Sequence, residues 1–541
     1  MSKVIEFGPE GRKKLVKGID TLADAVVSTL GPNGRNVVIE KDHQQVQSTK
    51  DGVTVARHIA VKDPVENLGV NLVREASIKT ADKAGDGTTT STLLAREMIK
   101  EGLQHLANGA NAVEIKRGID KAVKSVTSTL RKDIAEDISE ESQLEQVATI
   151  SANNDPEVGK LIATAIQKVG HEGVVHIEES KSGETYLETV EGMQFERGYK
   201  SHYFVTNNST MTSTLEDVQI LIVDERITTV KNLLPILESA ASQNKSLLII
   251  AEDIDNEALA TLIVNKGRGI IKTCAVKAPD FGDRRKLILE DIATLTGGTV
   301  FSKEKGHKWE KFQHDWFGEA RTVTITKDKT TIIDGRGSEE AVEARVADLT
   351  SQIENAESEF EREQLQNRLA RLCGGVSIIH VGGFTETEMN EKKDRVDDAL
   401  NATKAAIEEG IVPGGGTALL YARQSIDNCD IGAGIVYKAC GKPFEQILIN
   451  AGHTSVNAQM VGKYQLVESG DDCWAGFNIK EDKVVNMKEA GIIDPTKVTR
   501  VAVENAAAVA GTVLLTECIV VNEPEEDTKQ PQIDPTAMMG M

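Results

Sequence analysis

The sequence predicts a multi-domain α/β protein in which two helical end segments fold together around an inserted α/β segment. Three observations lead to this expectation. The chain has 541 residues, enough for several domains. Apolar residues recur at helical spacing near both ends. In the middle, short apolar strands alternate with helical patterns, which predicts a parallel sheet covered on both faces.

The first part of the chain is predicted to be mostly helical. Residues 11–31 carry apolar side chains at three- and four-residue spacing and favour a helix that ends at a Gly-Pro pair. A strand pair is expected next, "NVVIE" and "VTVAR", with Lys50 and Asp51 at the hairpin between them. Further helices are expected over "NLGVNLVREASIKTADKA", over the run after Asp86 and over "NAVEIKRGIDKAVKSVTSTLRK", with a boundary near Lys132.

The pattern of apolar residues changes in the middle of the chain and again near its end. Strands are expected at "DVQILIV", "SLLIIAED" and "GIIKTCAV", separated by the helices "VKNLLPILESAAS" and "NEALATLIVNKG". Residues 338–372 are predicted to form two charged amphipathic helices. From Gly410 onward Ala-rich helices return, and the polar tail from residue 524 is expected to be disordered.

Composition limits the possible partners and the compartment. A net charge of −22 argues against nucleic acid and anionic membranes, because both need clustered Lys and Arg. The six cysteines show no regular spacing, which is typical of reduced, cytosolic thiols. The start lacks the apolar core of a signal peptide, and the run "AAAVAGTVLL" is judged too short to span a bilayer. We therefore expect a soluble, cytoplasmic protein.

The stretch "AGDGTTTSTLLA", residues 84–95, is the first candidate for chemistry. Its glycines let a ligand approach the backbone closely, and the helix that follows directs its positive end at that ligand. Asp86 would repel an anion unless a cation lies between them, and Mg²⁺ bridging a carboxylate and phosphates is the obvious candidate. A capped helix without a ligand is the alternative, and the stretch alone does not decide between them.

Three further places carry possible chemistry, each with a structural alternative. "STLGPNGRN" and "TKDGV" offer free N–H groups or a carboxylate, but both also read as ordinary turns. In "DRVDDALNATKAAIEEGIVPGGGTALL", Asp397 and Asp398 are expected to start a helix and a triple glycine to precede another. Paired acids there usually complement the helix dipole, yet a carboxylate that orients water is what nucleotide hydrolysis requires. The sequence has no P-loop motif.

A candidate binding surface of another kind lies in the α/β segment. "RGYKSHYF" gathers aromatic residues in a chain whose aromatic content is only 4%. The helices "LLPILESA" and "EALATLIVNKG" each carry apolar residues at three- and four-residue spacing. These residues either pack on the sheet as core or face solvent as an apolar groove for unfolded chains or a partner loop.

Ten motifs in the same order give the chain a family resemblance. They include "LGPNGRNVVIE", "TKDGVTVA", "AGDGTTTSTLLA", "ISANND", "KAPDFGDRRK", "EKKDRVDDAL" and "GIIDPTKVTR". With these the chain resembles a group I chaperonin, the 60 kDa heat-shock family of bacteria and organelles. The resemblance implies an ATP-hydrolysing folding chamber: a homo-oligomeric, seven-membered ring, single or double, closed by a 10 kDa-type co-chaperonin lid over unfolded polypeptide substrates.

The resemblance also implies a division into three domains. The helical equatorial domain would comprise residues 1–133 and 410–523, followed by the tail 524–541. The small intermediate domain would comprise residues 134–191 and 376–409, and the α/β apical domain residues 192–375. Gly192, Gly375 and Gly410 look like the hinges.

Residue roles follow from the resemblance as well. The nucleotide would bind at Thr29, Leu30, Gly31, Pro32, Lys50, Asp86, Gly87, Thr88, Thr89, Thr90, Gly415, Asn478 and Asp494. Asp86 would hold Mg²⁺, with K⁺ as a further cation. Asp398 and Asp51 would be the catalytic acids. The apical rim that binds substrates and lid would comprise Tyr199, Tyr203, Phe204, Leu234, Leu237, Leu259, Ile263 and Val264.

Several positions depart from the family pattern. Lys200 and His202 stand in the rim motif where an apolar residue and Pro are usual. This departure keeps open an alternative function, a protein that holds unfolded chains with little or no lid-dependent encapsulation. "NAGHTSVNAQ" lacks the acidic pair of the family's ring-to-ring contact, which leaves open whether one ring or two form. A small-molecule kinase is the third hypothesis, although the apical segment offers no acceptor pocket that the sequence identifies.

Overall fold

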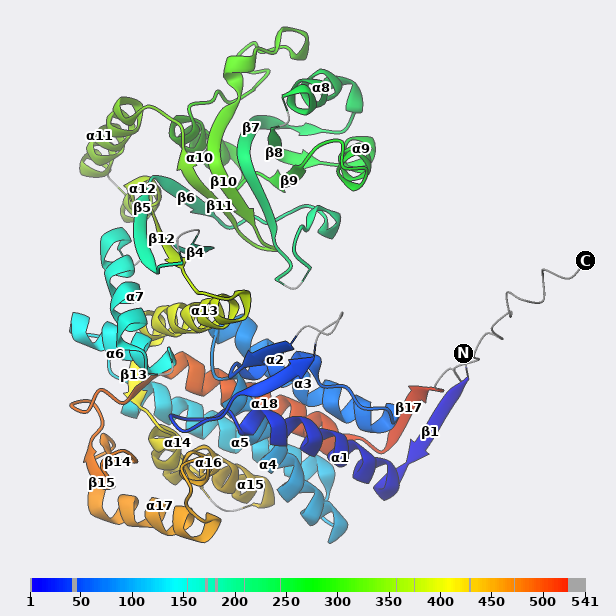
Figure 1. Ribbon diagram of the computed structural model, residues 1–541, viewed down its shortest axis with the longest axis vertical. Helices are drawn as coiled ribbons and strands as arrows, with labels where there is room; N and C mark the ends of the chain where they lie inside the picture. The colour runs from blue at the N-terminus through cyan, green and yellow to red at the C-terminus, as the bar shows by residue number, and fades with distance from the viewer. Residues whose placement is uncertain are drawn as a thin grey trace, which may run out of the picture. The chain divides into compact units, whose positions relative to one another are not determined.

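The chain folds into two compact units. A computed structural model describes residues 2–40, 46–152, 154–170, 174–180, 183–208, 210–243, 245–356, 358–373, 375–427, 430–470 and 472–523. Unit 1 comprises residues 1–162 and 384–541, and unit 2 comprises residues 163–383. Unit 2 is thus inserted into unit 1 (Figure 1). The three-domain division with its boundaries stays a prediction, and the tail from residue 524 lies outside the described residues.

Unit 1 is built mainly from helices contributed by both ends of the chain. Its first part contains β1 (Lys3–Phe7), α1 (Gly8–Val27), β2 (Val37–Glu40), β3 (Val46–Thr49), α2 (Gly52–His58), α3 (Pro64–Ala84), α4 (Thr88–Ala107), α5 (Ala112–Thr129), the short π-helix Leu130–Ile134 and α6 (Glu141–Ser151). Helix α7 (Pro156–Val169) crosses into unit 2. The second part contains α13 (Glu386–Glu409), β13 (Ile411–Pro413), α14 (Thr417–Ala422), α15 (Ile431–Cys440), α16 (Lys442–Asn450), α17 (Ser455–Ser469), β14 (Ala475–Asn478), β15 (Lys483–Asn486), β16 (Ile493–Pro495), α18 (Thr496–Leu515) and β17 (Cys518–Asn522).

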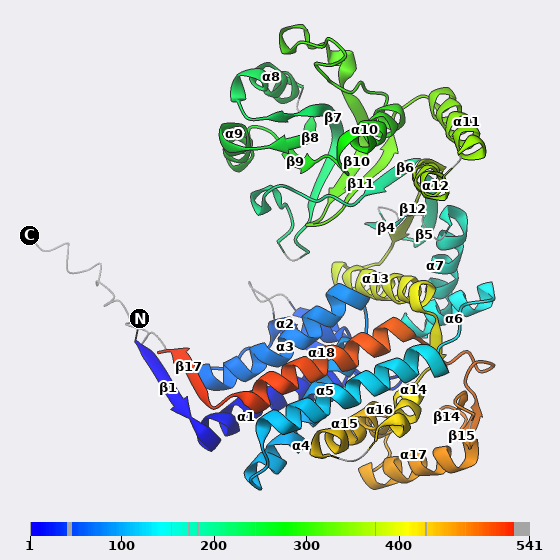
Figure 2. The ribbon, with the colours of Figure 1, turned by 180° about the vertical axis from the view of Figure 1, so that it is seen from behind.

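The two ends of the chain meet in a two-stranded sheet. Strand β1 pairs antiparallel with β17, from Lys3 opposite Asn522 to Phe7 opposite Cys518. Nearby, α18 packs against α3, α4 and α5, and Figure 2 shows it running between α3 and α5. The ends of the chain therefore fold as one body, as the Ala-rich helices at both ends predict.

Helix α18 corrects one expectation. By length and composition alone it is apolar enough to cross a membrane, whereas the apolar run near the end of the sequence predicts a segment too short to do so. The helix is longer than the run "AAAVAGTVLL" because Val501, Ala502 and Val503 extend its apolar surface toward the N-terminus. In the most apolar 18-residue stretch of α18, 72% is buried inside the protein. Helix α18 is therefore a core helix.

Two local predictions in unit 1 are wrong. "VTVAR" forms helix α2 and not a strand, and β3 lies earlier, so that Asp51 caps a helix and does not sit in a hairpin. Its carboxylate accepts hydrogen bonds from the N–H groups of Val53 and Thr54. This capping outweighs the strand propensity of the valines. Asp398 lies in the middle of the 24-residue helix α13 and not at a helix start.

Unit 2 is centred on a six-stranded mixed sheet of order β6-β11-β10-β7-β8-β9 (Figure 1). Strands β7, β8 and β9 are parallel, as predicted, whereas β10, β11 and β6 add antiparallel pairs that were not foreseen. The elements of the sheet are β6 (Gly192–Phe195), β7 (Ser213–Ile227), α8 (Leu234–Ser242), β8 (Ser246–Ile254), α9 (Asn256–Gly267), β9 (Thr273–Lys277), α10 (Gly282–Thr296), β10 (Gly318–Ile325) and β11 (Thr330–Gly335).

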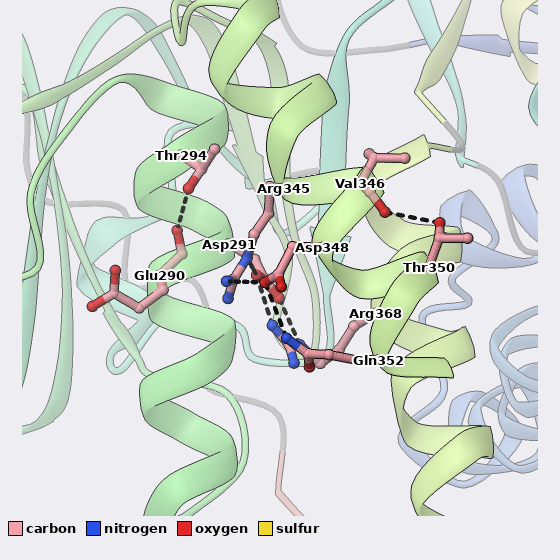
Figure 3. A network of polar contacts seen from close by, with 9 residues as sticks. All are labelled: Glu290, Asp291, Thr294, Arg345, Val346, Asp348, Thr350, Gln352 and Arg368. Atoms are coloured by element: carbon pink, nitrogen blue, oxygen red, sulfur yellow. Dashed lines mark hydrogen bonds and ion pairs between the residues drawn. The ribbon is translucent and has the colours of Figure 1, made fainter. Parts of the chain in front are cut away.

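The two charged helices are found as predicted, α11 (Glu339–Asn355) and α12 (Glu359–Cys373). A buried carboxylate joins them to α10: Asp291 accepts hydrogen bonds at 2.8 Å from Arg345 Nε and at 2.8 and 2.9 Å from Arg368 Nε and Nη2 (Figure 3). Apolar residues of α11 and α12, among them Leu349 and Leu365, complete the contact with the sheet domain.

A second, three-stranded sheet completes unit 2. Its order is β4 (Val174–Glu179), β12 (Val376–Val381) and β5 (Tyr186–Val190), with β4 parallel and β5 antiparallel to β12. The glycines proposed as hinges differ in conformation. Gly375 and Gly410 have positive φ, at 59° and 77°, whereas Gly192 is the buried first residue of β6. Their role as hinges stays a prediction.

Candidate functional site

One cavity of about 870 Å³ in unit 1 gathers the predicted nucleotide residues. The residues that line it come from the end of α1, the turn before α2, the start of α4, helices α6 and α13, and the segments around β13, β14 and β16. All thirteen positions expected to contact nucleotide line this cavity, and so do Asp51 and Asp398. They are Thr29, Leu30, Gly31, Pro32, Lys50, Asp86, Gly87, Thr88, Thr89, Thr90, Gly415, Asn478 and Asp494. Their roles stay predictions, but the structure brings these distant segments together.

The N-terminus of α4 forms one wall of the cavity. Gly87 precedes the helix with φ of 82°, a conformation that favours glycine, and its missing Cβ would lie 2.7 Å from Val498. Among the residues that the structure describes, no side chain caps this helix. The first N–H groups of a helix have no partner within it, so those of Thr88, Thr89 and Thr90 remain for a ligand. A 20-residue helix with these free donors is suited to bind an anionic group.

The turn before α2 forms a second wall. Because Asp51 caps α2, its carboxylate is fixed at the cavity beside Lys50. Gly52 allows this wall to approach the start of α4 closely, since a Cβ there would lie only 2.4 Å from Thr89 Oγ1. Thr89 Oγ1 also lies 3.4 Å from Thr29 Oγ1, which joins the end of α1 to the same wall.

A third group of polar residues comes from the second half of the chain. Strands β13 and β16 pair so that Val412 lies opposite Asp494, and the triple glycine follows β13 directly. The side-chain oxygen of Asn478, at the end of β14, accepts a hydrogen bond of 3.0 Å from the N–H of Lys480. This bond leaves the side-chain NH₂ group of Asn478 as its donor at the cavity.

Asp398 reaches the cavity from α13. An apolar cluster fixes this helix, in which Val147 of α6 packs with Ala402 and Ala406 of α13, together with Ile411 and Ile493 of the two short strands. Asp398 lies one helical turn before Ala402, on the side of α13 that lines the cavity. The packing of α6 and α13 therefore decides where this carboxylate sits.

The acidic groups of the cavity repel one another. Burial raises the pKa of Asp398 well above its ordinary value, and Asp51 and Asp86 add to the rise. Burial also raises the pKa of Asp86, to which Asp51 contributes. The pKa of Asp494 is raised to about 7 by burial and by the charge of Asp86. A site that holds four carboxylates in this way favours a bound cation.

The carboxylates of the cavity fit an Mg²⁺ ion that takes its remaining ligands from a bound phosphate and from water. In the described part of the chain, no group of three His, Cys, Asp or Glu side chains forms a metal cage. Mg²⁺ is usually bound by one or two carboxylates together with phosphates and water, which needs no such cage. Asp86, beside the free N–H groups of α4, is the carboxylate best placed to hold it.

The cavity also includes residues that no sequence motif predicts as part of a site. Helix α6 and the turn after it contribute Ser142, Glu145, Gln146, Thr149, Ile150, Ser151 and Asn154, and residues 479–492 contribute a further edge. The motif "ISANND" was the available signal for the first group, but without a glycine-rich loop or an acidic pair it suggested no chemistry.

The predicted apical rim divides into exposed and buried residues. Tyr203, Leu234 and Val264 are exposed, and Tyr199, Leu259 and Ile263 are partly buried against the core of unit 2. Phe204 and Leu237 are buried in that core, and their role in the rim stays a prediction. Lys266 of α9 donates hydrogen bonds of 2.7 Å to the carbonyl oxygens of Tyr203 and Val205. These bonds tie the end of the aromatic segment "RGYKSHYF", residues 197–204, to the helix.

Lys200, which departs from the family pattern, and two tryptophans have structural roles in unit 2. Lys200 forms ion pairs with Asp253 and Asp255, so its charge is compensated within the unit and is not presented alone at the rim. Trp309 stacks on Phe301 with ring centroids 4.1 Å apart, and Trp316 lies tilted to the same ring at 6.1 Å. Together they give residues 302–317 a small aromatic core.

The family comparison agrees with this arrangement. The model of the TCP-1/cpn60 chaperonin family matches residues 22–524, nearly the whole chain. The chain therefore belongs to the TCP-1/cpn60 chaperonin family, and this membership supports a chaperone role. Members of the family generally hydrolyse ATP and act on unfolded substrates as oligomeric rings.

Proposed function

We propose that this protein is an ATP-driven chaperonin, a cytoplasmic ring that binds non-native polypeptides at the exposed rim of unit 2 and folds them in a closed cavity. The observation that supports this most strongly is the cavity of unit 1, which is lined by every residue expected to bind nucleotide and by both predicted catalytic acids. The lid partner and seven-fold ring belong to the same proposal.

The chain's own groups suggest how hydrolysis would proceed. The N–H groups of Thr88, Thr89 and Thr90 would hold the phosphates at the positive end of α4. Lys50 would add a positive charge near them. Mg²⁺ on Asp86 would neutralise phosphate charge when bound. Asp398 would accept a proton from the attacking water, and its raised pKa suits it to this role as a general base.

Replacing the proposed base tests the hydrolytic step. Asp398→Ala is expected to leave ATP binding within about twofold and to lower turnover at least about 100-fold, the usual contribution of a general base. Binding is measured by calorimetry and turnover by phosphate release. Asp397→Ala, one residue away on an exposed side of α13, is the matched control and should keep near-normal turnover. Unchanged turnover in Asp398→Ala would contradict the assignment.

A holding protein without encapsulation is the second candidate, because Lys200 and His202 alter the rim motif. The two functions differ in their response to a lid. If a 10 kDa-type co-chaperonin slows ATP turnover and closes over bound substrate, encapsulation is supported. If it has no effect while the protein still prevents aggregation of unfolded chains, the holding function is favoured.

A further inference from the structure

Another cavity of unit 1 lies between helix α5 and the short 3₁₀-helix Arg423–Ser425. Its volume is about 430 Å³, and sites for small molecules usually have roughly 300–1,000 Å³. Helix α14 packs against α5 and leads directly into the 3₁₀-helix, so the cavity joins segments that lie far apart in the sequence (Figure 2). Among the described residues, those that line it are all polar: Lys121, Lys124, Ser125, Ser128, Thr129 and Ser425.

Helix α5 presents ammonium and hydroxyl groups along one face of this cavity. Each lysine is followed four residues later by a serine, Lys121 by Ser125 and Lys124 by Ser128, and this spacing places the four side chains on one side of the helix. In the described part of the chain, the hydroxyls of Ser125, Ser128 and Thr129 form no hydrogen bond with another group of the protein. These hydroxyls can therefore donate hydrogen bonds to a ligand.

The two lysines of the cavity form no ion pair with any residue that the structure describes. Other cations nearby do: Lys116 pairs with Asp120, and Arg131 pairs with Glu409 at 3.2 Å. The sequence has no Asp or Glu over residues 121–132, and no described carboxylate lines the cavity. In a chain whose net charge is −22, this cavity is thus a local concentration of positive charge.

The helix dipole does not explain why the lysines stand here. A lysine complements the dipole within the last turn of a helix, whereas Lys121 and Lys124 lie eight and five residues before the end of α5 at Thr129. Two like charges that stand three residues apart on a helix repel each other. An anion bound between the two ammonium groups would remove this repulsion.

The wall formed by the 3₁₀-helix adds positive charge. Arg423 forms no ion pair within the described part of the chain, and its Nε atom is buried without a hydrogen-bond partner there. Its guanidinium lies 4.7 Å from the centroid of the Tyr437 ring. The hydroxyl of Ser425 already donates a hydrogen bond of 2.7 Å to the carbonyl oxygen of Ala422, so Ser425 closes the cavity without supplying a donor. The donors for a ligand therefore come from α5.

We propose that this cavity binds a small anion that carries a phosphate group. Lysine binds phosphate as a point charge, and the three free hydroxyls of α5 would donate hydrogen bonds to the remaining phosphate oxygens. The polar lining does not suit an apolar ligand, and the volume leaves room for a small organic group attached to the phosphate. This cavity shares no lining residue with the one that holds Asp86 and Asp398, so the proposal does not depend on the proposed function.

Calorimetry on the full chain tests the site, with inorganic phosphate and glycerol 3-phosphate as probes at constant ionic strength. Lys121→Ala combined with Lys124→Ala should weaken the binding of both probes at least about tenfold, since a hydrogen bond to a charged group contributes roughly that much. Lys13→Ala combined with Lys463→Ala is the matched control, because it removes the same charge from exposed sites on α1 and α17. Distant exposed charges are screened, so the control should bind within about twofold of wild type.

Ser125→Glu provides a second, independent test. It places a carboxylate four residues after Lys121, which should abolish binding of the probes and raise the melting temperature by supplying the missing counter-charge. Tighter binding of glycerol 3-phosphate than of phosphate would identify a phosphate monoester as the ligand, and equal binding would identify free phosphate. Phosphate held at the N-terminus of α4 would not respond to the lysine substitutions. Unchanged affinity in the lysine variant, or no binding of either probe by wild type, would therefore overturn the proposal. Both lysines are exposed, so their variant should fold.

Discussion

At the scale of single residues, the cavity of unit 1 depends on carboxylates held close together. Asp494 is the clearest case, because its pKa is raised to about 7 by burial and by Asp86, against 3.8 ordinarily. The folded protein therefore holds the proton of this carboxyl more tightly than the unfolded chain does. Without nucleotide or Mg²⁺, ionised Asp494 opposes folding, and ligands that bring positive charge relieve this cost.

The pH dependence of stability follows from this shift. Below about pH 4 the carboxyl is neutral in folded and unfolded chains, and its contribution to stability is intact. As the pH rises through 7, that contribution is lost. The melting temperature of ligand-free Asp494→Asn should therefore exceed that of wild type by an amount that grows between pH 4 and 7 and is constant above. Asp315→Asn, an exposed site in unit 2, is the control. A difference that does not vary with pH would contradict the argument.

Sequence reasoning identified many of these residues but not their local structure. Asp51 was expected in a turn between strands, yet it caps α2 with both carboxylate oxygens. The prediction was wrong because it followed the strand propensity of "VTVAR". Propensities do not include the hydrogen bonds by which Asp51 caps the helix.

At the scale of elements, one buried ion cluster joins three helices of unit 2. Asp291 of α10 is only 1% exposed and receives Arg345 from α11 and Arg368 from α12 (Figure 3). Removing one partner from a buried cluster leaves the other charges unpaired away from water, which costs much more than the cluster gains by forming. The attachment of α11 and α12 therefore depends on this carboxylate as well as on their apolar contacts with the core.

Asp291→Asn is expected to lower the free energy of unfolding of unit 2 by about 3 kcal/mol, since Arg368 would be left buried without its counter-charge. Urea unfolding followed by tryptophan fluorescence measures this, because Trp309 and Trp316 lie in unit 2. Asp348→Asn is the matched control. Asp348 pairs with Arg345 at the surface, so its loss should cost less than about 1 kcal/mol. Equal effects of the two variants would rule out the buried cluster as the main attachment.

At the scale of the whole molecule, two functions are assigned to two separate units. The cavity proposed to bind nucleotide lies in unit 1. The exposed residues of the predicted rim, Tyr203, Leu234 and Val264, lie in unit 2. Substrate capture should therefore be separable from basal ATP turnover by mutation.

Leu234→Ser combined with Val264→Ser tests this separation. Each exposed side chain offers apolar surface to a bound chain, so the double variant should bind an unfolded polypeptide at least about tenfold more weakly. Basal ATP turnover should change less than about twofold. Affinity is measured by fluorescence anisotropy of a labelled, reduced substrate. Phe281→Ser removes an apolar residue that is even more exposed than these two, and this variant should bind normally. If all three substitutions weaken binding alike, the rim is not a specific surface.

The sequence by itself determined the class of fold, the family and part of the cavity lining, because these depend on apolar periodicity and on motifs that lie within short segments. Only the tertiary structure decided which residues share a surface. Phe204 and Leu237 lie in the core, whereas Tyr203 is exposed. Lys200 forms an ion pair with Asp253, and helix α6 lines the cavity. These outcomes depend on contacts between segments far apart in the chain, and local patterns contain no information about which of several apolar faces a neighbouring element will cover.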